Sequence, residues 1–372
     1  MDKIKIGITG QSGFMGTHLY NFLGLQQNVE RIPFKDEYFN KSPRLCEFVE
    51  KCDVIVHLAA MNRHHDQNIL HDTNVALVQE LIQALEKTER KPHVLFSSST
   101  QESRDNPYGR SKRKGRELLI NWSKKHAAPF TGLVIPNVFG PFGEPFYNSV
   151  ISTFSHQIVQ NLDPRIETDA ELNLIYINDL MSEIWRVIRD RVTVSEHGIQ
   201  EIARANVSQI LEKLQWFRKT YVNDKIIPDV SDYFDLCLFN TFRSYLPVDF
   251  FPSDFNVHSD DRGQFIELVK SDNSGQTSYS TTKPGITRGN HFHIRKIERF
   301  MVIQGEALMQ LRRIGTDEVI VYKLTGDEPV FVDVPVWYTH NITNTGDTNL
   351  LTVFWINELF NPADPDTYYE QV

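Results

Sequence analysis

The chain has 372 residues, more than one hydrophobic core usually serves, so two domains are expected. Its formal net charge of -9 argues against nucleic acid or an anionic membrane as the main partner. The three cysteines form no CxxC pair, which argues against a disulfide framework or a cysteine zinc site. No apolar run reaches membrane-span length, and the sequence starts directly with a strand pattern. These features predict a cytoplasmic protein without membrane insertion.

Short apolar runs alternate with helical patterns in the first part of the chain. IKIGIT, DVIVHLAA, HVLFSSS and FTGLVIP are typical of buried strands, and the segments between them have helix length and periodicity. This repetition predicts an α/β, doubly wound parallel sheet of the Rossmann-like type over residues 1–246. A helix is expected in EIARANVSQILEKLQWFRKTY, from Glu201, and the domain boundary is expected around Leu246–Ser253.

A glycine-rich turn follows the first predicted strand. In TGQSGFMG, Gly10, Gly13 and Gly16 recur at a spacing of three, directly before a predicted helix. Such glycines let the backbone approach a pyrophosphate, whose charge the helix N-terminus then faces. Many glycine clusters are only turns, but the strand-to-helix context favours a nucleotide site here.

A second motif lies between residues 97 and 112. Three serines end the FSSS strand, and Tyr108 and Lys112 lie four residues apart, on one face of a predicted helix. Lys112 is expected to lower the pKa of the Tyr108 phenol and to contact the nicotinamide ribose. Tyr108 would donate a proton to a carbonyl oxygen as hydride arrives, while a serine hydroxyl holds that oxygen. Taken alone, a YxxxK pattern usually marks a solvated helix face.

Together these pieces resemble the extended short-chain dehydrogenase/reductase family, which acts mostly on nucleotide sugars. The resemblance covers most of residues 1–180 and rests on TGQSGFMG, DVIVHLAA, DTNVALV, FSSS, YGRSK and PNVFGP. It implies Ser99 as the catalytic serine with Tyr108 and Lys112, and Asn137 as a substrate-binding residue. One departure from the family pattern is a shortened segment between Ser99 and Tyr108, which shortens the loop expected to cover the substrate. The cofactor-binding residues implied by the resemblance are Gly10, Gly13, Phe14, Met15, Gly16, Lys35, Asp53, Leu58, Ala59, Ala60, Asn74 and Lys112.

The nicotinamide cofactor is expected to be NADPH. Members of the family that use NAD usually carry an acid at the end of the second strand, where this chain reads VERIPFKDE. Lys35, or less readily Arg31, could meet a 2′-phosphate there. The acidic residues Asp36 and Glu37 argue instead for NAD. The alternative for Arg31 and Lys35 is that both merely face solvent.

The pattern changes in the last part of the chain, which we assign to a second domain at residues 247–372. Short alternating runs, among them QFIELV, ERFMVIQG, EALMQLRR, EVIVYKL, PVFVDVP and LLTVFWI, are separated by Gly, Asp and Pro. This spacing predicts an all-β sandwich or barrel.

Four residues of this domain predict a metal site. His291 and His293 lie two apart on a strand and so face one side, Glu298 follows after a turn, and His340 comes later. Three imidazoles and a carboxylate suit zinc, with manganese or iron as alternatives. The spacing resembles the first motif of the cupin family, which implies an all-β cupin barrel; the second motif is partial, with Trp337 in place of the usual glycine. A pair of barrel histidines without metal is the alternative.

The segments DDRGQF and TRGNHF also resemble the cupin-like nucleotide-sugar epimerases of the dTDP-rhamnose pathway. That resemblance implies that His291 is a general base, which conflicts with a role as metal ligand. Arg262 and Arg288 would suit a diphosphate because a guanidinium pairs with phosphate oxygens. Lys283 and Tyr338 are further candidates for proton transfer, although a surface or packing role is the more common one for either residue taken alone.

A keto sugar would link the two halves, because a carbon beside a ketone loses a proton readily and reduction then fixes its configuration. The whole chain resembles the bifunctional epimerase/reductase enzymes of bacterial surface polysaccharide synthesis. That resemblance implies a UDP-linked 4-keto amino sugar as substrate, inversion at C3, reduction at C4 to UDP-2-acetamido-2,6-dideoxy-L-talose, and a homodimer. The alternatives are a monofunctional sugar reductase or dehydratase with a ligand-binding or oligomerising cupin, and a nucleotide-sugar sensor without turnover.

Overall fold

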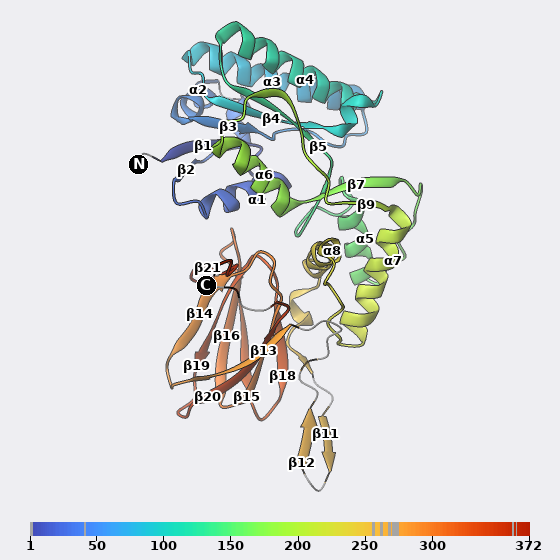
Figure 1. Ribbon diagram of the computed structural model, residues 1–372, viewed down its shortest axis with the longest axis vertical. Coiled ribbons are helices and arrows are strands. Elements are labelled where there is room, and N and C mark those ends of the chain that lie inside the picture. Colours follow the sequence, from blue (N-terminus) through green and yellow to red (C-terminus); the bar gives the residue numbers. More distant parts are fainter. Residues whose placement is uncertain are drawn as a thin grey trace. The chain divides into compact units, whose positions relative to one another are not determined.

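The computed structural model describes residues 3–40, 42–254, 257–260, 263–266, 269, 275–358, 361 and 363–372. The chain forms two compact units (Figure 1). The first contains residues 1–153 and 168–207, and the second contains residues 154–167 and 208–372. The described residues include no helix long and apolar enough to cross a membrane.

The first unit is built on a six-stranded parallel sheet with the order β2-β1-β3-β4-β5-β8. This confirms the doubly wound α/β prediction. A small second sheet has the order β6-β7-β9. The elements are β1 (Ile4–Thr9), α1 (Phe14–Gly24), β2 (Val29–Ile32), η1 (Asp36–Asn40), α2 (Ser42–Lys51), β3 (Val54–His57), α3 (Gln67–Thr88), β4 (His93–Ser99), η2 (Thr100–Ser103), α4 (Pro107–His126), β5 (Phe130–Ile135), β6 (Asn137–Phe139), β7 (Glu171–Tyr176), α6 (Ile177–Arg189), β8 (Val194–Gly198) and β9 (Ala203–Asn206).

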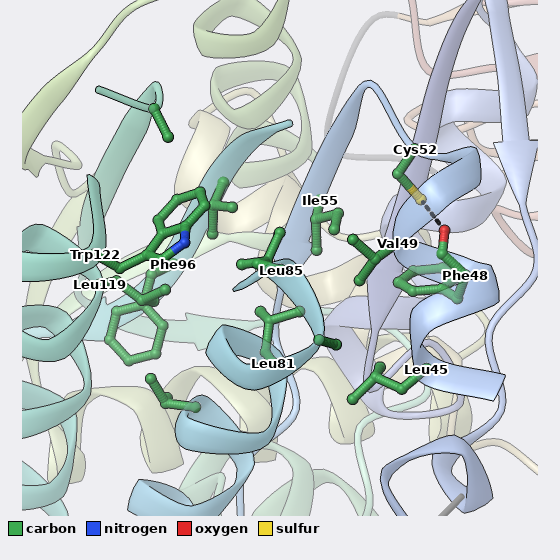
Figure 2. Close-up of a cluster of buried hydrophobic side chains, with 14 of the residues drawn as sticks. Leu45, Phe48, Val49, Cys52, Ile55, Leu81, Leu85, Phe96, Leu119 and Trp122 are labelled. Atoms are coloured by element: carbon green, nitrogen blue, oxygen red, sulfur yellow. Dashed lines mark hydrogen bonds between the residues drawn. The ribbon is translucent and has the colours of Figure 1, made fainter. Parts of the chain in front are cut away.

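One face of this sheet is covered by α2, α3 and α4, which bury an apolar cluster against β3 and β4 (Figure 2). Leu45 and Phe48 of α2, Leu81 of α3 and Trp122 of α4 all belong to it. Burial of side chains of this size stabilises the fold by about 1.5–3 kcal/mol each. The cluster fixes the helices that carry the candidate active-site residues.

The strand order reverses beside β1, so the carboxyl ends of β1 and β3 form a topological switch point. Ligands of open α/β sheets bind in the crevice at such a point. Here the glycine-rich turn follows β1 at Thr9, and the segment from Leu58 to Ala60 follows β3. The backbone therefore brings two of the predicted cofactor segments together.

The second unit contains two antiparallel five-stranded sheets, β10-β18-β15-β20-β13 and β17-β16-β19-β14-β21, which confirms the cupin-like all-β prediction. A β11-β12 hairpin is separate from both sheets. The strands are β10 (Ser253–Asp254), β11 (Val257–Asp260), β12 (Gly263–Ile266), β13 (Gln276–Thr282), β14 (Thr287–Phe292), β15 (Glu298–Gln304), β16 (Glu306–Arg313), β17 (Val319–Thr325), β18 (Val330–Val334), β19 (Tyr338–Asn344), β20 (Leu350–Ile356) and β21 (Tyr368–Tyr369).

Helices α7 (Val207–Phe217) and α8 (Tyr233–Arg243) pack with these strands in one unit, together with η3 (Arg218–Asn223) and η4 (Val248–Phe250). Helix α5 (Val150–Val159) contains one change from the first unit to the second. The helix expected from Glu201 was wrong at its start, because residues 203–206 pair with β7 as strand β9. The contact boundary lies at residue 207, so the domain boundary at residue 246 stays a prediction.

Candidate functional site

The glycine-rich turn packs directly against the segment after β3. Gly10 has φ +70°, and a Cβ there would lie 2.8 Å from the Ala59 backbone, so a side chain is excluded. A Cβ on Gly16 would lie 2.1 Å from the Gly10 carbonyl oxygen. At Gly13, by contrast, a Cβ would meet only that oxygen, at 3.4 Å. The chain itself therefore leaves Gly13 bare and accessible, at the N-terminus of α1 where a phosphate is favoured.

Asn74 orders the segment that follows β3. Its side-chain amide exchanges two hydrogen bonds with the Met61 backbone, at 2.6 and 3.0 Å, and donates to Ser111 Oγ at 3.1 Å. The Ala59 N–H donates to Thr9 Oγ1 at 3.4 Å. Asn74 was predicted to contact the cofactor. In the structure its hydrogen bonds to Met61 fix the segment after β3, which lies at the switch point.

Of the other predicted cofactor residues, Asp53 is misplaced. It precedes β3, at the edge of the sheet opposite the switch point, and its carboxylate accepts the Lys5 N–H at 2.9 Å. Arg31 donates to the Tyr20 carbonyl at 3.0 Å and covers the Tyr20 ring. Lys35 is exposed beyond β2. Close to it, Asp36 accepts a hydrogen bond from Ser12 Oγ of the glycine turn at 2.7 Å.

The three serines at the end of β4 have different partners. Ser97 Oγ donates to the His57 carbonyl at 3.1 Å, and Ser98 Oγ donates to Glu102. Ser99 caps η2, because its Oγ accepts the Gln101 N–H at 3.2 Å. An acceptor role leaves the Ser99 hydroxyl hydrogen available for a carbonyl oxygen.

Tyr108 and Lys112 lie on the first turns of α4, as the spacing predicted. Lys112 is buried; its Nζ donates to the Ser97 carbonyl at 2.9 Å and lies 5.6 Å from the centre of the Tyr108 ring. Burial lowers the pKa of Lys112 to about 8. The expected lowering of the Tyr108 pKa was wrong, because burial, with Tyr147 nearby, raises the pKa of this phenol to about 12. A phenol that stays protonated suits a proton donor.

A sequence reading missed the ion pair that braces the short segment between Ser99 and Tyr108. Glu102 turns inward and accepts from Arg116 of α4 through Nε at 2.9 Å and Nη2 at 2.6 Å. The small Gly109 lets α4 approach this segment, since a Cβ there would lie 2.1 Å from the Gln101 carbonyl oxygen. No sequence motif identifies Glu102 as part of the site, because its partner Arg116 lies 14 residues later, on α4.

In the second unit, the four predicted metal ligands converge. One ligand atom from each of His291, His293, Glu298 and His340 lies within 4.8 Å of the others. His291 comes from β14, Glu298 from β15 and His340 from β19, while His293 follows the end of β14. Glu298 Oε2 lies 3.0 Å from His293 Nε2 and 3.2 Å from His340 Nε2. The two sheets therefore face each other across this cluster.

The donor set fits a divalent metal. Both Nε2 atoms and Glu298 Oε2 are buried at ion-pair distance, but they have no hydrogen-bond partner among the described residues. Buried polar atoms without partners are costly, and a shared cation would satisfy all three at once. Burial, followed by His340, lowers the pKa of His291 to about 4, so this imidazole is neutral at pH 7. Burial opposes ionisation of Glu298, yet its contacts with His293 and His340 lower the pKa of this carboxyl.

Trp337, which replaces the usual glycine of the second cupin motif, adopts the left-handed φ of 62°. That conformation explains why glycine is usual at this position. The tryptophan side chain is buried, and its ring stacks on Phe292 with centroids 5.5 Å apart. The backbone N–H of Trp337 donates to the His293 carbonyl at 2.8 Å.

The residues predicted to contact substrate are less well defined. Asn137 is exposed on β6 and donates to the Asn173 carbonyl at 3.1 Å. Arg288 is exposed on β14 and donates to Thr282 Oγ1 and the Thr281 carbonyl, each at 3.1 Å. Arg262 lies outside the described residues. Lys283 is exposed, and Tyr338 is half-buried with a pKa raised by burial.

Comparison with protein families identifies the first unit. The profile of the NAD dependent epimerase/dehydratase family matches residues 6–203. The chain belongs to this family. Its expected identity as an NAD(P)-dependent enzyme is thereby confirmed. The profile of the polysaccharide biosynthesis C-terminal domain matches residues 258–368 of this epimerase/dehydratase-family protein.

Two relatives match this family member along nearly its whole length, and a third matches part of it. UDP-2-acetamido-2,6-beta-L-arabino-hexul-4-ose reductase of Pseudomonas aeruginosa is 33% identical over 98% of each chain. The crystal structure of the capsular polysaccharide assembling protein CapF of Staphylococcus aureus is 35% identical over 99% of this chain and 100% of that one, with a TM-score of 0.65. The spore coat polysaccharide biosynthesis protein SpsL of Bacillus subtilis is 31% identical over 29% of this chain and 79% of its own.

Proposed function

We propose that this protein is a bifunctional UDP-sugar epimerase and reductase of capsular polysaccharide synthesis. Its cupin-like half inverts C3 of a UDP-2-acetamido-2,6-dideoxy-4-keto-hexose, and its α/β half reduces the C4 ketone with NADPH to UDP-2-acetamido-2,6-dideoxy-L-talose. The observation that carries the proposal is similarity along the full chain to a named UDP-hexulose reductase, combined with two separate clusters of chemically suited side chains.

The reductase half needs a proton at the ketone oxygen when the cofactor supplies hydride to the carbon. Tyr108 is the proposed donor, because its phenol keeps its proton and lies on the same helix face as Lys112, one turn away. Ser99 would hold the same oxygen with the hydroxyl hydrogen that its capping role leaves available. Lys112, fixed to the Ser97 carbonyl, would orient the nicotinamide ribose.

The cupin-like half needs a stabilised enolate. A divalent metal, proposed as zinc, would supply positive charge for the enolate oxygen when bound. His291, His293, Glu298 and His340 would hold it, since their ligand atoms already gather in one small space. Removal of the proton beside the ketone and its return from the other face would invert C3, and reduction at C4 then removes the acidity that permits reversal.

Three finer assignments belong to the same proposal. Lys35 is proposed to meet the 2′-phosphate of NADPH, since it is exposed beyond β2. The exposed Arg288, with Arg262, is proposed for the diphosphate of UDP. The protein is proposed to act in the cytoplasm as a homodimer, because cupins and reductases of this type often pair.

The test is the mass of the product formed in deuterated water. The protein is incubated with UDP-2-acetamido-2,6-dideoxy-L-arabino-hexos-4-ulose, the configuration that inversion at C3 and reduction at C4 convert to L-talose, and with NADPH. The product is then returned to ordinary water beside a protein-free control. A reduced sugar that retains carbon-bound deuterium supports both activities. Reduced sugar without deuterium would contradict the epimerase role and leave a monofunctional reductase. The absence of both changes would contradict the assigned substrate.

Two variants separate the halves in this assay. Tyr108→Phe is expected to keep deuterium exchange into the keto sugar while it loses reduction. His293→Gln is expected to lose exchange while NADPH still binds with unchanged affinity. If His293→Gln exchanges deuterium as fast as the unsubstituted protein, the cluster is not the epimerase centre.

A further inference from the structure

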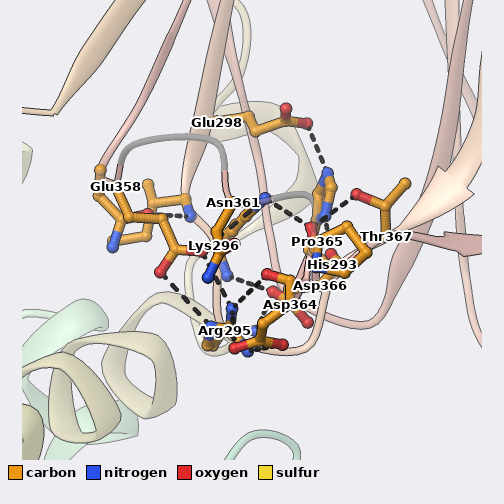
Figure 3. Close-up of polar contacts among 12 residues, drawn as sticks. His293, Arg295, Lys296, Glu298, Glu358, Asn361, Asp364, Pro365, Asp366 and Thr367 are labelled. Carbon is orange, nitrogen blue, oxygen red and sulfur yellow. Dashed lines mark hydrogen bonds and ion pairs between the residues drawn. The ribbon is translucent and has the colours of Figure 1, made fainter.

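The C-terminal tail of the chain lies directly against the histidine cluster. Strand β21 pairs with β14, so that Tyr369 lies opposite His291 and Tyr368 opposite Phe292. Just before this strand, the Asp366 carbonyl accepts a hydrogen bond from His293 Nδ1 (Figure 3). When Nδ1 carries the hydrogen of a neutral imidazole, Nε2 is the nitrogen left as a ligand. His293 Nε2 is the atom that faces Glu298.

The Asp366 carboxylate anchors the tail to the turn that follows His293. Its Oδ1 accepts the Ile294 N–H at 3.2 Å, and its Oδ2 accepts the N–H groups of Arg295 and Lys296 at 3.1 and 3.0 Å. The residue is 2% exposed and has φ 41°, in the left-handed region that disfavours most side chains. Three backbone donors on one carboxylate offset that cost.

From these contacts we propose that Asp366 is a positioning residue for the metal centre, acting through His293. Its carboxylate fixes the tail on the turn at 294–296, and its carbonyl then holds the His293 ring with Nε2 toward the cluster. The inference rests on the metal centre of the proposed function. Groups that orient a ligating histidine in this way typically alter metal affinity by about 10–100-fold when they are removed.

Asp364, in the same C-terminal segment as Asp366, provides a matched control. Asp364 lies two residues earlier and pairs with Arg295, Oδ2 to Nη2 at 2.9 Å, and among the described residues no hydrogen bond or ion pair joins it to His293. Asp364→Asn therefore removes one carboxylate charge from the same tail without loosening the ring. Asp366→Asn is the test variant, because asparagine tolerates a left-handed φ yet replaces the Oδ2 acceptor with a donor.

The experiment measures zinc affinity of the full chain by competition with a chelating dye, with the melting temperature of the metal-free protein recorded in parallel. Asp366→Asn is expected to bind zinc about 10–100-fold more weakly, and Asp364→Asn within about twofold of the unsubstituted protein. If Asp366→Asn binds zinc as tightly as the unsubstituted protein, this inference is wrong, while the proposed metal centre itself is unaffected. Loss of the metal-free fold in that variant would assign the residue to stability and overturn the inference too. Failure of the unsubstituted protein to bind zinc would instead overturn the metal centre itself.

Discussion

A buried ion network ties the helical segment of the second unit to its sheets. Asp333 of β18 is fully buried and accepts from Arg299 of β15 through Nε at 2.7 Å and Nη2 at 2.8 Å. The Tyr221 hydroxyl of η3 donates to the same carboxylate. Arg243 of α8, also buried, donates to the Val334 carbonyl at 3.1 Å. A single carboxylate thus lies among two guanidinium groups and a phenol.

Asp333→Asn removes the only negative charge among these four side chains. The Arg299 guanidinium then stays buried without its ion-pair partner, and breaking a buried pair in this way costs about 3–5 kcal/mol. For a unit of this size, the melting temperature should fall by about 6–20 °C. Tyr221→Phe removes one hydrogen bond to a charged group and should cost about 1.5–3 kcal/mol. Asp333→Asn should therefore destabilise the unit more than Tyr221→Phe, because only Asp333→Asn leaves a buried positive charge without its partner.

Calorimetry and urea unfolding would measure both variants, with NADPH binding recorded to check that the first unit stays intact. The exposed pair of Arg44 and Glu47 provides the control, because Glu47→Gln should not move the midpoint. The double change Arg299→Met with Asp333→Leu should recover much of the loss, since it leaves fewer unpaired charges. A cost below about 1 kcal/mol for Asp333→Asn would refute the view that this network holds α8 and η3 on the sheet.

Four further outcomes are expected. Tyr108→Phe should lower the reduction rate by about 10²–10⁴-fold in steady-state kinetics without weakening NADPH binding. His340→Gln should lose bound zinc, measured by metal analysis, and with it deuterium exchange, while reduction of a keto sugar persists. Lys35→Ala should raise the KM for NADPH by about tenfold and leave that for NADH unchanged, since one pairing with phosphate is lost. His93 is buried with a pKa lowered to about 4, so the unfolded chain takes up a proton below about pH 6.5 that the folded chain refuses. This histidine should therefore contribute a fall in stability between pH 6.5 and 4, of about 2 kcal/mol at pH 5, and His93→Gln should make the fall shallower by that amount in urea titrations.

The features of the fold that could be predicted are those that depend on residues close together in the sequence. β1, β3, β4 and β5 were visible as apolar runs, and Tyr108 and Lys112 lie together because helical spacing places them on one face. The segment from Glu201 was misread because β9 is short and its residues acquire strand geometry only by pairing with β7. Short strands of this kind carry too little pattern to be told from the start of the helix that follows.

Contacts between segments that lie far apart in the sequence could not be predicted from the sequence. Asp53 looked like part of a cofactor motif, but only the sheet reveals that it lies at the wrong edge. Asp366 lies 73 residues from His293 along the chain, and nothing in its neighbourhood marks it as a partner. The direction of the Tyr108 pKa was misjudged for a similar reason, since burial by surrounding residues outweighs a lysine one turn away.

The two candidate centres are assembled by different backbone rules, and this bears on the conflict over His291. In the α/β unit, side chains gather because parallel strands end together, whereas in the cupin-like unit they gather because facing sheets direct side chains inward. His291 is the half-buried member of its cluster, and its ring also makes a hydrogen bond to the Gly289 backbone. The ring offers one lone pair when its other nitrogen carries the hydrogen, so a bound metal and a carbon-bound proton would compete for the same nitrogen. His291 gathers with His293, Glu298 and His340, and this supports the proposed ligand role, under which we expect the base to be another residue near the cluster.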